Sequence, residues 1–130
     1  MDYLKAISTA HSTYTEGAPL TTKLQLTMGR LVGGWVWFPS GPAGVLHLKA
    51  EIGGHQILPS TPGENYALNN VVVPFNLDYD ITTFPLTLDL HTWNDSTVYA
   101  HNLAVCIFMN PLAVPEKKRT FWGMLRGSDD

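Results

Sequence analysis

The stretch that decides the fold runs from Arg30 to Pro59 and reads RLVGGWVWFPSGPAGVLHLKAEIGGHQILP. Its first third is apolar and runs into Pro39, which has no amide hydrogen for a sheet, so a strand must end there or lie at an edge. Glycine and proline then dominate residues 40–44, which predicts a chain reversal. The stretch therefore predicts two strands around a compact corner and a short third strand after it.

Polar and apolar side chains alternate after this corner. Leu46, Leu48, Ala50 and Ile52 alternate with Val45, His47, Lys49 and Glu51. A period of two residues places the two sets on opposite sides of a strand, so one side is expected to be buried and the other solvated. Gly53-Gly54 then has the chemistry of a tight hairpin turn.

The rest of the chain contains further segments with strand character. With the segments above they lie near 3–14, 20–28, 30–38, 44–52, 55–58, 70–76, 84–93 and 97–109. Pro74 confines its segment to an edge or a bend, and residues 76–80 read as a polar connection. The segment 103–109 is apolar on both sides, which predicts a central strand or one covered by a partner.

These segments predict an all-β fold, a single jelly-roll sandwich of about eight antiparallel strands over residues 1–110. An immunoglobulin-type sandwich is the nearest rival. That fold commonly places a buried tryptophan beside an inter-sheet disulfide, which the single cysteine, Cys106, cannot form. We expect Cys106 to be a small buried hydrophobic residue.

Charge and composition limit the classes of function. Only 15% of the residues are charged and the net charge is −3. Residues 1–114 carry four Lys or Arg against eight Asp or Glu, a net −4, whereas residues 115–130 carry four against three, a net +1. This acidic body argues against a nucleic-acid partner. With neither a secretion signal nor an apolar run of about eighteen residues, we also expect no membrane partner.

Residues 111–130 differ in character and are predicted to form a docking tail with a short helix. Phe121, Met124 and Leu125 would share one helical stripe, which Trp122 broadens, after the basic run Lys117-Lys118-Arg119. So short a helix is unstable alone in water, so it needs a surface to lie against. The sandwich of the same chain and a neighbouring subunit are both candidates, with a membrane surface or disorder as further alternatives.

The histidines of the sequence do not form a complete set of metal ligands. A cupin-type centre needs a pair of histidines one residue apart, a glutamate and a distant third histidine, and only His47 and Glu51 fit that pattern. His91 and His101 would face each other if the turn at 94–96 closed a hairpin, but two imidazoles lack a third ligand. We expect no metal and no cofactor.

The sequence also contains no motif of a known catalytic mechanism, and we expect a protein that is not an enzyme. Aromatic side chains suggest a different activity. Trp35, Trp37 and Trp93, with Asn94 and Asp95, would suit a glycan-binding platform, although tryptophans on apolar strands are more often core or interface residues.

Several short motifs between residues 20 and 109 carry a family resemblance. They are Phe38-Pro39 with Gly41 and Gly44, Gln56-Ile57-Leu58-Pro59, Pro85-Leu86-Thr87-Leu88, and Thr92-Trp93-Asn94-Asp95 with His101 in the following strand. As a series they resemble the small single-jelly-roll virion proteins of tailed bacteriophages and related viruses. The resemblance supplies no catalytic residues, and residues 111–130 lie outside the shared pattern.

The resemblance implies a virion structural protein that is made and assembled in the host cytoplasm. A capsid decoration or cement protein is the leading expectation, as a homotrimer that binds the major capsid protein or another virion protein. The capsid surface then joins the candidate docking surfaces for the tail. A carbohydrate- or receptor-binding module of a viral fibre or spike is the alternative.

Overall fold

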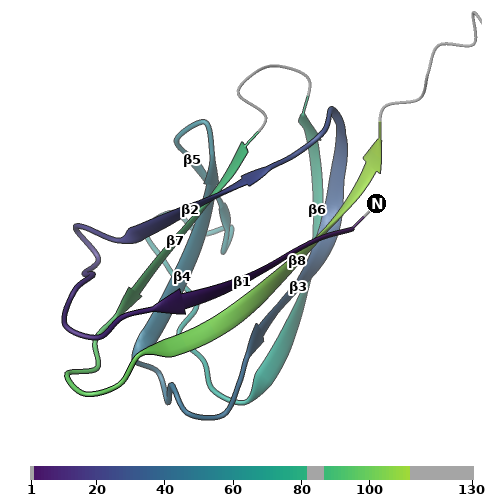
Figure 1. The fold of residues 1–130 in the computed structure, drawn as a ribbon. Helices are drawn as coiled ribbons and strands as arrows, with labels where there is room; N and C mark the ends of the chain where they lie inside the picture. The colour runs from purple at the N-terminus through teal and green to yellow at the C-terminus, as the bar shows by residue number, and fades with distance from the viewer. Residues whose placement is uncertain (1, 82–86, 112–130) are drawn as a thin grey trace, which may run out of the picture.

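The computed structural model describes residues 2–81 and 87–111, which form two four-stranded antiparallel sheets that face each other (Figure 1). The first sheet contains, in spatial order, β1 (Asp2–Thr9), β8 (His101–Pro111), β3 (Gly29–Phe38) and β6 (Val71–Ile81). The second contains β2 (Leu20–Gln25), β7 (Thr87–Asn94), β4 (Leu46–Ile52) and β5 (His55–Leu58). The prediction of an all-β protein of about eight strands is confirmed.

The strands pair in a nested order. The first pairs with the last, the second with the seventh, the third with the sixth and the fourth with the fifth. The innermost pair is the predicted β4–β5 hairpin, where Gly53 and Gly54 have φ angles of 58° and 83° that favour glycine. Every other connection between successive strands joins the two sheets.

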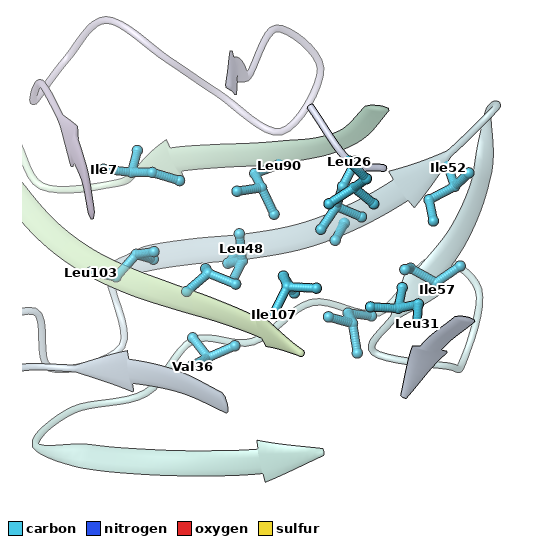
Figure 2. Packing of buried hydrophobic residues seen from close by; sticks show 14 of the residues in the cluster. Ile7, Leu26, Leu31, Val36, Leu48, Ile52, Ile57, Leu90, Leu103 and Ile107 are labelled. Atoms are coloured by element: carbon cyan, nitrogen blue, oxygen red, sulfur yellow. The ribbon is translucent and has the colours of Figure 1, made fainter. Parts of the chain in front are cut away.

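The core lies between the sheets and is almost entirely aliphatic (Figure 2). Leu48 and Leu90 from the second sheet and Val36, Leu103 and Ile107 from the first point into this space (Figure 2). The alternation predicted for β4 is confirmed, since its four apolar side chains are buried and its polar ones are only half-buried. Burying side chains of this size stabilises the fold by about 1.5–3 kcal/mol each.

A glycine bulge in β3 brings three strands of the first sheet close together. The register of β3 shifts between Leu31 and Gly33. A Cβ on Gly34 would lie 1.9 Å from the carbonyl oxygen of Cys106, and one on Gly33 would lie 2.5 Å from that of Phe75. Only glycine allows β8 and β6 to approach β3 so closely.

Several strand boundaries differ from the sequence predictions. The first strand ends at Thr9 rather than near residue 14, and the last begins at His101 rather than near residue 97. Residues 76–80, predicted as a connection, belong to β6, because Leu77 and Tyr79 pack against the core in alternation with exposed residues. On the exposed side, Arg30 of β3 forms ion pairs with Asp78 and Asp80 at 3.1 and 3.3 Å. Pro74 lies in this strand at the edge of the sheet, as predicted.

The predicted hairpin around residues 94–96 is wrong. Strand β7 belongs to the second sheet and β8 to the first, so His91 and His101 do not face each other across a hairpin. Residues 95–100 instead connect the two sheets. The predicted helix in the tail and the start of the strand near residue 84 lie outside the described residues.

Candidate interaction surface

The outer side of the first sheet carries two apolar rows. The strand register aligns Leu4, Cys106, Trp35 and Pro74 in one row and Ala6, Ala104, Trp37 and Val72 in the next. The side chains that alternate with these residues along β3 and β8 fill the core. We call the surface formed by these two rows the Trp face.

The Trp face is exposed over much of its width. Leu4 is 65% exposed, Val72 53% and Trp37 43%, and together they span three of the four strands. Ala104 and Cys106 lie between β1 and β3 in these rows and are buried. Exposed apolar side chains gathered in this way make the Trp face a candidate interaction site.

Polar residues border the Trp face at both ends. At the end where β8 finishes, Arg30 lies with Asp78 and Asp80, and Asp2 occupies the outer side of β1 nearby. At the other end, Ser8 and Asn102 are paired across β1 and β8. An apolar centre with a polar rim is the usual composition of a protein interface.

The outer side of the second sheet, which we call the polar face, is different. Among the described residues of its four strands, Trp93 is the one large aromatic side chain on this side. It is only 3% exposed, and the His47 ring stacks on it with centroids 5.0 Å apart and planes within 2° of parallel. The His47 ring is held in turn, with Nδ1 2.7 Å from Asn65 Oδ1 and Nε2 2.7 Å from Asp95 Oδ2.

Further pairs cover the rest of the polar face. His91 Nε2 lies 3.1 Å from Glu51 Oε1, and its Nδ1 lies 2.9 Å from the Thr21 hydroxyl. Lys23 Nζ donates a hydrogen bond to Asp89 Oδ1 at 3.0 Å. Within residues 2–81 and 87–111, no group of three or more His, Cys, Asp or Glu side chains is placed to hold a metal ion. These contacts join polar side chains of neighbouring strands to one another.

The five residues of the predicted glycan platform do not form one surface. Trp35 and Trp37 lie on the Trp face, where their neighbours in the two rows are apolar, whereas Trp93 lies under His47 on the other sheet. Asp95 belongs to the His47 cluster. The predicted tail residues lie outside the described part of the chain.

Asn94, the remaining platform residue, is 2% exposed and joins the end of β1 to the connection formed by residues 95–100. Its Nδ2 donates to the carbonyl oxygens of Thr9 and Tyr99 at 3.0 and 2.9 Å. Its Oδ1 accepts a hydrogen bond from the Ser96 amide at 2.9 Å. The polar atoms of the Asn94 side chain are therefore hydrogen-bonded to the backbone of the protein itself.

Cys106 lies in the Trp face and is a poor nucleophile. Burial raises the pKa of its thiol, and the charge of Asp2 raises it further. The environment therefore fits the apolar role that the sequence predicts.

Sequence reasoning missed the parts of the Trp face that β1 and β6 contribute. One signal was present, because Trp35 and Trp37 alternate with Val36 and Phe38 and so make both sides of β3 apolar. A strand that is apolar on both sides indicates cover on both sides. Which residues of β1 and β6 lie beside the tryptophans depends on a register that local sequence does not encode.

Compared with known proteins, the sequence matches no family model and no curated protein. The resemblance to virion proteins therefore rests on the quoted motifs alone. Among the described residues, no helix is long and apolar enough to cross a membrane.

Proposed function

We propose that this chain is a non-enzymatic virion structural protein, a capsid decoration or cement protein that assembles as a homotrimer through its Trp face. One observation carries the assembly part, namely the two contiguous apolar rows across all four strands of the first sheet. The motifs between residues 20 and 109 support the virion part, with the major capsid protein or another virion protein as the second partner.

We further infer that the sandwich is a jelly roll. The support is the nested pairing, in which a long antiparallel ribbon doubled at the β4–β5 turn is rolled so that its strands alternate between two sheets. Two four-stranded sheets with these connections suit the arrangement of eight strands in a jelly roll. The predicted helix around Phe121 to Leu125 belongs to the same proposal as its docking element.

Energetics favour an interface with a broad apolar centre. Covering a large side chain such as Trp37 or Leu4 contributes about 1.5–3 kcal/mol, while association itself costs about 4–15 kcal/mol. Two or three such side chains contribute about 3–9 kcal/mol, which offsets only the lower part of that cost. The exposed Ala6 and Pro74 and the half-buried Trp35 of the two rows add to this contribution when a complementary partner covers the whole Trp face.

Sedimentation equilibrium of the purified full-length chain tests the assembly. We expect a homotrimer at micromolar concentration, and a monomer at all accessible concentrations would contradict the proposal. Mass spectrometry of intact virions tests the location and is expected to find this chain beside the major capsid protein. If virions lack the chain, the decoration role is wrong even where the trimer exists.

The carbohydrate-binding alternative is now limited to Trp35 and Trp37. Exposure of the Trp37 ring favours it, since aromatic faces pack on sugar rings. The neighbouring Val72 and Pro74 offer no side-chain hydrogen bonds to sugar hydroxyls, which a specific site needs. A glycan array with the wild-type chain and a Trp37→Ala variant decides this alternative, because only a true site gives signals that the variant loses.

A further inference from the structure

We propose that the Trp face of one copy binds the C-terminal tail, residues 112–130, of a second copy. This inference rests on the proposed homotrimer and names the contact that builds it. The tail is nineteen residues long and begins where β8 ends, between β1 and β3 in the sheet that carries the Trp face. Every copy therefore offers one face and one tail.

The tail and the Trp face have complementary chemistry. Phe121, Trp122, Met124 and Leu125 give the tail an apolar segment that matches the two apolar rows. The basic run 117–119 precedes it and carries three positive charges. The border near the end of β8 contains Arg30 and three aspartates, a net −2, which suits a basic segment lying beside the apolar centre.

The proposed homotrimer favours a neighbouring copy over the tail's own face as the partner. The Trp35 row crosses β8 at Cys106, five residues before Pro111, so about 17 Å of strand separate this row from the start of the tail. A tail that docked on its own face would cover the two apolar rows that the homotrimer is proposed to use. A tail that crosses to the next copy covers the rows and joins the two copies through the same contact.

The tail is long enough to cross between copies. Phe121 lies ten residues after Pro111, and ten residues span at most about 36 Å when fully extended. This length would also allow the tail to return to its own face. The mixture of variants described below distinguishes these two arrangements, because only a tail that crosses to another copy joins two chains.

The contact is heterologous, because a tail on one copy meets a face on the next. Heterologous contacts close into rings when the rotation between copies allows it, and three such contacts close a trimer. A heterologous contact also predicts how two defective variants behave when they are mixed. A copy whose face is disrupted still has its tail, and a copy that lacks the tail still has its face. Only one contact can form between them, so the mixture is expected to give a dimer and no larger species.

Two variants of the full-length protein separate the two halves of the contact. In the first, Trp37→Asp introduces a charge into the face at an exposed position, which should leave the fold intact. In the second, the chain ends at Pro111 and lacks the tail. Each variant alone is expected to self-associate on the order of tenfold to a hundredfold more weakly than the wild type.

The decisive measurement is a 1:1 mixture of the two variants. Native mass spectrometry distinguishes them by mass, and sedimentation equilibrium gives the association constant. We expect a mixed dimer of one copy each and no mixed trimer. If no mixed species forms up to several hundred micromolar, exchange between copies is wrong and the inference is overturned.

Failure of the inference and failure of the proposed function give different results. A tail-deleted chain that remains a trimer overturns tail docking but leaves the homotrimer in place. A wild-type chain that is monomeric overturns the assembly itself. Val98→Asp is the matched control, because Val98 is exposed and apolar but lies in the connection between β7 and β8. It should assemble as the wild type does, with circular dichroism confirming that all variants fold.

Discussion

The outer sides of the two sheets differ although both cover the same core. On the polar face, ring stacking and hydrogen bonds join the side chains to one another, as in the contacts of His47 and His91. On the Trp face, Leu4, Trp37 and Val72 remain exposed to solvent. The first surface is complete within one chain, whereas the second gains most from a partner. The predictions below test this difference.

The largest effect is expected from Gly34→Ala, which changes the bulge beneath the Trp face. Its Cβ would collide with the Cys106 carbonyl oxygen, and neither backbone can move without disturbing the β3–β8 pairing. We expect a loss of more than about 3 kcal/mol in the free energy of unfolding, or failure to fold. Urea denaturation measures it.

Gly53→Ala in the second sheet is the matched control. Gly53 also has a positive φ, but a Cβ there would meet nothing within 4 Å. Only the left-handed backbone penalty of about 1–2 kcal/mol should remain. Equal losses for the two variants would show that close strand approach does not distinguish the sheets.

Asn94→Ala should have the next largest effect. It removes three hydrogen bonds from a buried position and leaves the carbonyl oxygen of Thr9 without this donor. Each bond contributes about 0.5–1.5 kcal/mol, so we expect a loss of about 2–4 kcal/mol in thermal or urea unfolding. A glycan-contacting asparagine would instead lose binding without losing stability, and that result would restore the sugar-binding interpretation for this residue.

A pair of alanine variants tests the comparison of the faces directly. His47→Ala removes the cover of Trp93 and two hydrogen bonds, so unfolding free energy should fall by about 1–3 kcal/mol while self-association stays unchanged. Trp37→Ala should do the reverse, with a small change in the stability of the isolated chain and a clear loss of assembly. If both variants alter only stability, the Trp face is not an interface.

Local patterns predicted the local structure well. Alternation assigned the sides of β4, Gly53-Gly54 marked the hairpin, and Pro74 placed its strand at an edge. The apolar segment 103–109 was predicted to be central or covered by a partner, and the first alternative is confirmed, because β8 lies between β1 and β3. Each of these features depends on side chains close together in sequence, so periodicity and turn chemistry suffice.

The sequence did not reveal which strands far apart in the chain pair with each other. The turn chemistry of residues 94–96 suggested a hairpin, but the Asn94 side chain instead bonds to Thr9 from the opposite end of the chain. Likewise, Asp78 and Asp80 look like loop residues until Arg30 of the neighbouring strand pairs with both. The Trp face itself depends on the register of four strands, which no single segment determines.

The smallest expected effect is a difference between the sheets in alkaline solution. Burial raises the pKa of Cys106 on the first sheet and of Tyr66, which bridges to Leu48 beside the second. Both groups are neutral when protonated, so a raised folded pKa means stability that is present below the unfolded pKa and lost as pH rises through the folded value. Unfolded thiols titrate near pH 8.5 and phenols near pH 10.

Stability should therefore decline first through Cys106 and, at higher pH, through Tyr66. Urea unfolding between pH 8 and pH 11 measures this, with Cys106→Ala expected to reduce the early part of the decline and Tyr66→Phe the later part. Asp2→Asn should reduce only the early part, because the Asp2 charge contributes to the raised pKa of Cys106 alone.

Assembly adds a final distinction, since covering the Trp face buries Cys106 further. Thiol modification should be slower in the trimer than in the tail-deleted chain, and equal rates would place Cys106 outside the interface.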